Sequence, residues 1–238
     1  MCGYIQLVTD SPHVQALLIE VGLDDLVPDM VTDTHDILHS YPAFGGIPRY
    51  LHGLIHREGD RAVTSDAIWW YDCQAEGENV LIGDRTTFNA RNLESNYWKG
   101  AIRHKRALVV ATGFGETGNV GGKKKHYLLE SHRSAILLGA VYRRLNSSTL
   151  CCAIITRPAS KEFARYHEKA MPLMLPGKAS VIHEWLDQDI EQSPIIDDLL
   201  ENPTVIPALR ITQVKTFKSA EKITGTEVEL VGSISSGD

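Results

Sequence analysis

The stretch that decides the fold is residues 134–157, SAILLGAVYRRLNSSTLCCAIITR, in which two apolar, strand-like segments flank a short polar turn. Similar segments precede it: YLHGLIH at 50–56, AVTSDAIWWY at 62–71 and RALVVATGF at 106–114. Runs of this length and composition are typical of β-strands. A parallel βαβ series would need helices between these strands, and the sequence leaves no room for them. The sequence therefore predicts a mostly antiparallel, barrel-like sheet.

Helical patterns gather near the two ends of the chain. Ser11 and Pro12 are typical of a helix start, and apolar residues follow at helical spacing as far as Leu23. Later helices are predicted from about Ser160, over SVIHEWLDQ at 180–188 and over PIIDDLLEN at 194–202. The expected fold class is α+β. One domain of residues 1–238 holds the sheet, helices flank it, and strands within 208–232 complete it.

Composition limits the classes of protein that fit. The chain has 238 residues, of which 43% are hydrophobic and 23% charged, and no apolar run approaches the roughly 20 residues of a membrane span. The start, MCGYIQLVTDSP, lacks the basic and apolar regions of a signal peptide. We therefore expect a cytoplasmic protein with no membrane partner.

The charge distribution is uneven. A net charge of −6 argues against a generic nucleic-acid binder, because phosphate contacts need Lys and Arg. Residues 91–144, however, carry 11 basic and 3 acidic residues, whereas the rest of the chain carries 13 and 27. This basic middle third is either one positive groove or a set of solvated strand faces, and charge alone leaves both open.

The four cysteines differ in setting. None lies in a C-x-x-C pair, so we expect no metal site and no cofactor, and Cys151 and Cys152 fit buried, inert thiols. Cys2 is different, because a small residue at position 2 permits removal of Met1. The product has a thiol and a free α-amine on neighbouring carbons, and such an amine has a pKa of about 7.7–8.0. This pair can act as a nucleophile with its own base, or condense with an aldehyde. The alternative is a chance residue at the start of a strand.

Five further segments carry a resemblance. They are AIWWY at 67–71, TFNARNLES at 87–95, RALVVATGFGETG at 106–118, YHEKAMPLML at 166–175 and VIHEWLD at 181–187. In this order and spacing, after the Cys-Gly start, they resemble the SOS response-associated peptidase (SRAP) family over residues 2–186. The matches align Asn89 and Arg91 with the family's Asn-Ala-Arg motif, Glu116 with its glutamate, and His167 with the histidine before Met-Pro.

The resemblance implies an enzyme of DNA repair, of the hydrolase or lyase class. Such an enzyme recognises abasic sites in single-stranded DNA and forms a covalent thiazolidine cross-link through Cys2 after Met1 is removed. Self-cleavage at Met1 and reversal of the cross-link are further activities that the family suggests. We also expect a monomer that associates with the nucleoid when on DNA.

The resemblance also assigns roles to residues. Cys2 supplies the bonding atoms, Asn89 orients the α-amine, Glu116 acts as acid and base, and His167 assists proton transfer at the sugar. Arg91 contacts a phosphate. The other expected DNA contacts are Pro42, Phe44, Trp69, Trp70, Met171 and Pro172. Strand alternation places Trp69 and Trp70 on opposite faces, so one is expected in the core and the other against a base.

Departures from the family pattern affect the DNA contacts. Tyr4 stands where the family often has Arg, SYPAFGG at 40–46 replaces a segment with an Asn, and Thr117 replaces a Trp. Pro42 and Phe44 would then supply an apolar or stacking surface. We therefore expect the reacting groups to be kept and DNA recognition to be altered.

Other readings stay open at this point. An N-terminal nucleophile glutamine amidotransferase also begins Cys-Gly in its mature form, and an inactive DNA-binding module is a third alternative. Glu116 could be a carboxylate at the tip of a turn, His167 a packed helix residue, Asn89 a turn cap and Arg91 half of a surface ion pair. The run Lys123, Lys124 and Lys125 could be a solvated hairpin tip or a phosphate contact.

Overall fold

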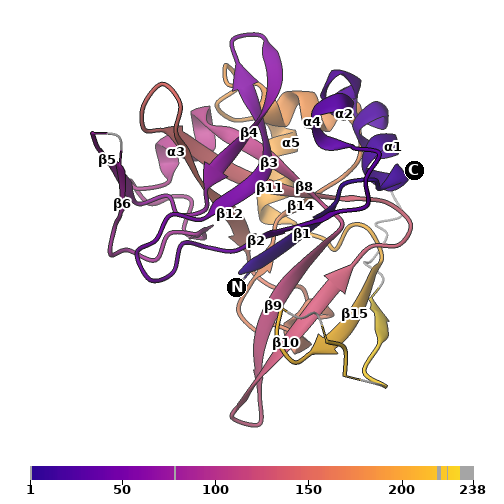
Figure 1. The fold of residues 1–238 in the computed structure, drawn as a ribbon. Helices are drawn as coiled ribbons and strands as arrows, with labels where there is room; N and C mark the ends of the chain where they lie inside the picture. The colour runs from indigo at the N-terminus through magenta and orange to yellow at the C-terminus, as the bar shows by residue number, and fades with distance from the viewer. Residues whose placement is uncertain (1, 78, 219–220, 224, 231–238) are drawn as a thin grey trace.

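The computed structural model describes residues 2–77, 79–218, 221–223 and 225–230 (Figure 1). Five strands close into a barrel in the order β12, β4, β3, β8 and β11, with β11 pairing back to β12. Their bounds are β3 Tyr50–Glu58, β4 Arg61–Ile68, β8 Arg106–Ala111, β11 Ile136–Arg144 and β12 Leu150–Arg157. The β12–β4 pairing is parallel and the other four are antiparallel. The predicted α+β class and barrel-like sheet are confirmed.

The central barrel strands are buried on both faces. All six residues of β8 are buried, and Ala107 and Val109 belong to one hydrophobic cluster while Leu108 and Val110 belong to another. Side chains alternate across a strand, so the first cluster fills the barrel and the second meets the covering helices. A β-bulge between Leu51 and Leu54 shifts the pairing of β3, and Gly53 there has φ +67°.

A second, six-stranded antiparallel sheet adjoins the barrel, in the order β16, β15, β10, β9, β1 and β2. Its strands are β1 Tyr4–Val8, β2 Ile37–Ser40, β9 Gly113–Val120, β10 Lys123–Glu130, β15 Leu209–Val214 and β16 Val228–Leu230. The predicted C-terminal strands therefore join a sheet at β15 and β16; residues 231–232 of that prediction lie outside the described residues. Strands β8 and β9 follow each other directly, which brings the two sheets together.

Helices cover the outer face of the barrel. They are α1 Pro12–Glu20, α2 Val27–Met30, α3 Lys99–His104, α4 Ala179–Leu186 and α5 Pro194–Glu201, with a 3₁₀ turn at Asp24–Leu26. The predicted helices at Pro12, 180–188 and 194–202 are confirmed. The helix predicted from about Ser160 is wrong: the described segment has only a 3₁₀ turn at Phe163–Arg165. Phe163 is buried against Phe114, and this packing favours a compact turn over a longer helix.

Three short strands attach distant segments to the barrel, and two others form a separate hairpin. Strand β7 (Asn89–Ala90) pairs with β12. Strand β13 (Met171–Pro172) pairs with the C-terminal end of β12, and strand β14 (Met174–Leu175) pairs with β11. Strands β5 (Cys73–Glu76) and β6 (Asn79–Ile82) form a two-stranded hairpin. The pairings of β7 and β13 place two of the resemblance segments along one barrel strand.

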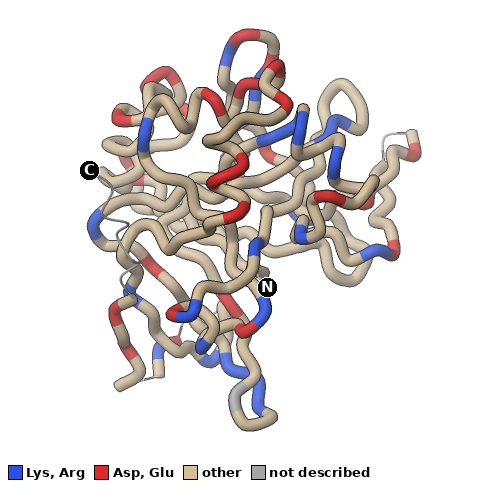
Figure 2. The backbone as a smooth tube through the Cα atoms, turned by 180° about the vertical axis from the view of Figure 1, so that it is seen from behind, with Lys and Arg blue, Asp and Glu red and all other residues tan. Residues whose placement is uncertain are grey.

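The basic middle third of the sequence does not form one groove. Arg106 is 1% exposed, and its guanidinium donates hydrogen bonds to five carbonyls, at the ends of α3 and α4 and in the loop that follows α4 (Ile102, Arg103, Trp185, Asp187 and Ile190). Arg103 and Arg144 pair with carboxylates. Of the two alternatives, one groove that collects these cations does not fit the described residues, because several of the cations serve the structure. Figure 2 shows Lys and Arg on the projecting β9–β10 hairpin, at a distance from the barrel cations.

Candidate functional site

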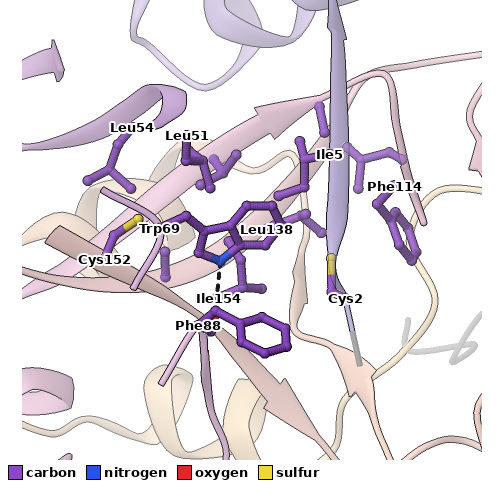
Figure 3. Close-up of a cluster of buried hydrophobic side chains, with 14 of the residues drawn as sticks. Cys2, Ile5, Leu51, Leu54, Trp69, Phe88, Phe114, Leu138, Cys152 and Ile154 are labelled. Carbon is purple, nitrogen blue, oxygen red and sulfur yellow. Dashed lines mark hydrogen bonds between the residues drawn. The ribbon is translucent and has the colours of Figure 1, made fainter. Parts of the chain in front are cut away.

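Cys2 lies at the start of β1, where the six-stranded sheet meets the barrel (Figure 1). The Gly3 amide donates to the Gly115 carbonyl (3.3 Å), which continues the pairing of β1 with β9. The Cys2 side chain is fully buried, and it lies in one cluster with Trp69, Phe88 and Phe114 (Figure 3). Its thiol is 3.9 Å from the Tyr4 carbonyl, a weak hydrogen bond to that oxygen. Burial raises the pKa of this thiol well above its ordinary value, and the Glu116 charge raises it further.

Glu116 lies inside β9, so it is not at the tip of a turn. Its side chain is fully buried, and burial raises the pKa of the carboxyl to about 7. The positive charge of the chain's amino terminus and that of Arg91 act against this rise. A carboxyl group with this pKa exchanges a proton near neutral pH. Glu116 therefore has the property required of a general acid and base beside Cys2.

Asn89 binds the backbone of Cys2. Its side-chain amide Nδ2 donates a hydrogen bond to the Cys2 carbonyl oxygen over 3.1 Å. Its Oδ1 atom is buried and has no hydrogen-bond partner among the described residues. A buried acceptor without a partner is costly, so Oδ1 is available to a group that arrives with the substrate or forms at the α-amine. Asn89 is thus a contact of Cys2 rather than a turn cap.

His167 is half-buried and is held by the turn that follows it. The Ala170 amide donates to its Nδ1 over 3.2 Å, so Nδ1 is the acceptor and the neutral ring carries its proton on Nε2. Burial, together with the positive charges of the amino terminus and Arg91, lowers the pKa of His167 to about 4. At neutral pH this ring is therefore an uncharged donor through Nε2.

Electrostatic interactions and one hydrogen bond connect five of the predicted residues in one site. Arg91 is exposed and follows β7, and its charge acts on both Glu116 and His167. Glu116 in turn acts on Cys2, which Asn89 contacts. The structure thus gathers segments from three distant parts of the sequence around the start of the chain.

One buried polar residue was missed in the sequence. Thr156 is 0% exposed on β12, and its Oγ1 has no hydrogen-bond partner among the described residues. Strand alternation puts it on the same face as Ile154, which shares a cluster with Cys2. The signal was a single hydroxyl in the apolar run LCCAIITR, which a search for charged or nucleophilic groups passes over.

The predicted DNA contacts differ in exposure: two are exposed to solvent and five are buried. Arg91 is exposed, and so is Phe44 at 49%, whose ring meets Trp70 and Phe88 edge-on. The side chains of the other five are buried: Pro42, Trp69, Trp70, Met171 and Pro172. Both tryptophans also donate their indole N–H to carbonyls, Trp69 to Phe88 and Trp70 to Gly83. The expectation that one of the two presents its face to a base is corrected: both rings are part of the packed interior.

The departure at Tyr4 has a structural reason. Tyr4 pairs with Gly115, so it lies on the sheet face opposite to that of Glu116. Its ring stacks on Phe217 with centroids 5.1 Å apart, and its hydroxyl contacts His39 Nδ1 at 2.7 Å. The tyrosine side chain therefore supports the back of the sheet, and only the Tyr4 backbone carbonyl contacts the candidate site, at the Cys2 thiol.

Other features of the described chain bear on function. No group of three or more His, Cys, Asp or Glu side chains is arranged there to hold a metal ion. Cys73, Cys151 and Cys152 are all buried, as expected for the latter two. The helices described are too short or too polar to cross a membrane. A cavity of about 590 Å³ lies between residues 22–29 and the β3–β4 turn, and none of the predicted site residues lines it.

Comparison with known proteins gives a family and a fold. The family model described as SOS response associated peptidase (SRAP) matches residues 1–217, whereas no curated protein matches the sequence. Three solved structures are similar, each with a TM-score of 0.59 over 90% of this chain. One is a protein from Bacteroides thetaiotaomicron (16% identity, 93% of that chain), and one a phage-related protein from Bordetella bronchiseptica (18%, 95%). Another protein from Bordetella bronchiseptica is 16% identical over 100% of its length.

At these identities the structural likeness shows the fold alone, and the family rests on the sequence match. That match covers the cysteine at position 2 and every residue gathered around it. The chain therefore belongs to the SOS response associated peptidase (SRAP) family.

Proposed function

We propose that the protein binds single-stranded DNA at abasic sites and forms a covalent thiazolidine cross-link through Cys2 once Met1 has been removed. The observation that carries the proposal is the buried carboxyl of Glu116, whose pKa is about 7 and whose charge acts on the Cys2 thiol. The thiol has a raised pKa and is protonated at neutral pH, so its addition needs a base. Glu116 is the group that supplies one.

The chemistry balances with the groups present. The ring-opened abasic sugar is an aldehyde, and the Cys2 α-amine adds to its carbonyl carbon to give a carbinolamine. Protonation of the hydroxyl releases one water and leaves an imine. The thiol sulfur then adds to the imine carbon, its proton leaves through Glu116 and returns to the nitrogen, and the five-membered ring closes. Because the amine and the thiol belong to the same residue, ring closure is intramolecular and the thiol has a high effective concentration at the imine.

Three polar residues position and move protons in this scheme. Asn89 holds the Cys2 carbonyl, and its free Oδ1 accepts a hydrogen bond from the α-amine, which aims the nitrogen lone pair. His167 donates from Nε2 to the sugar oxygen as the ring opens. Thr156 supplies a hydroxyl for a second oxygen of the open sugar, because such a ligand would satisfy its buried Oγ1.

DNA contact in this proposal rests on exposed groups. Arg91 binds a phosphate next to the abasic site, where its charge also acts on Glu116 and His167. Phe44 stacks on a neighbouring base from the 41–50 loop, since half of its ring surface is free. Binding of this kind needs no cofactor and fits a protein that acts as a monomer on a single strand.

The test is a time course of covalent product on a denaturing gel. Wild-type protein should cross-link a single-stranded oligonucleotide with one abasic site and leave the undamaged oligonucleotide unchanged. Cys2→Ala should form no stable product, although borohydride could trap an imine through its new terminal amine. A glutaminase assay in parallel separates the amidotransferase alternative: glutamine hydrolysis without cross-linking would refute the proposal.

A further inference from the structure

A second cavity, of about 310 Å³, opens beside His167. Residues 117–119 of β9 and residues 164–169 form its walls, and Lys124 of β10 closes one side. At Gly118 an added Cβ would lie 2.3 Å from the Tyr166 carbonyl oxygen. Only glycine permits this close crossing, so the 164–169 segment lies directly over the strand that carries Glu116. We call this space the His167 cavity.

The cations of the His167 cavity form no ion pair with a described carboxylate, although the charge of Arg165 acts on Glu162. Lys124, Arg165 and Lys169 line it together with one acid, Glu168, and none of the three forms an ion pair with a described residue. Three exposed arginines elsewhere on the described surface are paired, Arg103 with Glu191, Arg133 with Glu229 and Arg210 with Glu227. Arg49, Arg61 and Arg85 are exposed without such a pair among the described residues, but none of them lines this cavity. An excess of unpaired positive charge in a concave site attracts an anion.

Aromatic rings hold one of these cations at the rim. The Arg165 guanidinium lies 5.8 Å from the centre of the Tyr166 ring, and Tyr166 meets Tyr127 edge-on with centroids 5.2 Å apart. Cation–π contact of this kind fixes the direction of an otherwise free arginine. Basic side chains interleaved with aromatic rings are typical of surfaces that bind single-stranded nucleic acid.

We propose that the His167 cavity binds a backbone phosphate of the nucleotide next to the abasic one, so that the strand continues from Cys2 past His167 and along the β9–β10 hairpin. Lys124 and Arg165 contact the phosphate oxygens, while Arg91 holds the phosphate on the other side of the reacting sugar. This inference rests on the proposed function, because it extends the path of the same strand. It gives the Lys123–Lys125 run a role beyond a solvated tip.

Equilibrium binding tests the proposal. The probe is a single-stranded oligonucleotide with a tetrahydrofuran abasic analogue, which has no aldehyde and cannot cross-link. Lys124→Ala/Arg165→Ala should weaken binding roughly fivefold at low salt. The slope of log affinity against log salt should fall by about 0.7 for each phosphate that the variant no longer neutralises. Arg103→Ala/Arg133→Ala removes the same charge from paired sites and should change neither quantity.

Truncated probes locate the phosphate that the cavity binds. Shortening the oligonucleotide on one side of the analogue should weaken wild-type binding, and the same shortening should cost the Lys124→Ala/Arg165→Ala protein nothing further. Equal affinity and slope in the two double variants would overturn the inference, even with cross-linking intact. If inorganic phosphate stabilised wild type but not that variant and DNA affinity were unchanged, the cavity would be a site for free phosphate instead. Absence of DNA binding by wild type would refute the proposed function itself.

Discussion

The side chain of Asn89 donates a 3.1 Å hydrogen bond to the carbonyl of Cys2, a residue 87 positions earlier in the chain. The contact joins the Asn-Ala-Arg motif to the Cys-Gly start, which lie on different sheets. It fixes the backbone of the residue whose α-amine and thiol are proposed to react. The orientation of the nucleophile therefore depends on the pairing of β7 with β12.

Asn89→Ala should slow cross-linking by about 10²-fold, because a misplaced nucleophile loses much of its effective concentration. Affinity for the tetrahydrofuran abasic analogue, which cannot cross-link, should stay within about twofold of wild type, since other residues hold the DNA. Asn92→Ala, at an exposed amide in the loop that follows β7, is the matched control and should react at the wild-type rate. Equal rates in both variants would remove Asn89 from the mechanism.

Glu116→Gln should change the pH profile of the reaction. The wild-type carboxyl has a pKa of about 7, so the rate should change with pH around neutrality. The Gln variant should lose that inflection and react about 10²–10⁴-fold more slowly. Rates are measured across the neutral range, on both sides of this pKa, at saturating DNA. A variant that keeps the inflection would show that another group titrates there.

The shifted pKa values also give two opposite stability effects. His167 has a pKa of about 4 in the folded chain and about 6.5 when unfolded, so its contribution to stability is lost as the pH falls through this range. Glu116 has a folded pKa of about 7, so its contribution is lost as the pH rises from about 4.5 to 7. Urea unfolding at a series of pH values across both ranges measures the two effects. The two ranges overlap, and the two effects oppose each other there, so His167→Ala should leave a stability that falls as the pH rises, and Glu116→Gln should leave one that rises with pH. A profile unchanged in either variant would contradict its assigned pKa.

Arg106→Met should destabilise the fold by about 3 kcal/mol or more, because five carbonyls lose a buried charged donor. For a chain of this length the melting temperature should fall by about 6–12 °C. Arg103→Met removes an exposed arginine three residues away with a 3.8 Å ion pair, and should cost less than about 1 kcal/mol. Equal melting temperatures would show that Arg106 does not hold α3 and α4 together.

The sequence predicted the barrel and much of the site, for identifiable reasons. Strand runs such as RALVVATGF carry their own pattern, and Cys2, Asn89, Glu116 and His167 stand in motifs of reactive side chains. The burial and the contacts of each side chain were harder to predict from the sequence. Nothing local distinguishes Arg106 from the neighbouring exposed cations, since three of the five carbonyls that it binds are 79 or more residues away. Trp70 and Thr156 show the same limit. Strand alternation predicts on which face of the sheet a side chain lies, but other segments of the chain decide whether that face is buried.

The most direct measurement of the central claim is the intact mass of the protein after incubation with a single-stranded oligonucleotide that contains one abasic site. A thiazolidine at Cys2 predicts a single adduct whose mass is that of the chain without Met1 plus the oligonucleotide minus one water, because thiazolidine formation releases one water. Cys2→Ala should give no such species without a reducing agent. An equally abundant adduct on protein that retains Met1, or no adduct on protein shown to begin at Cys2, would contradict the account.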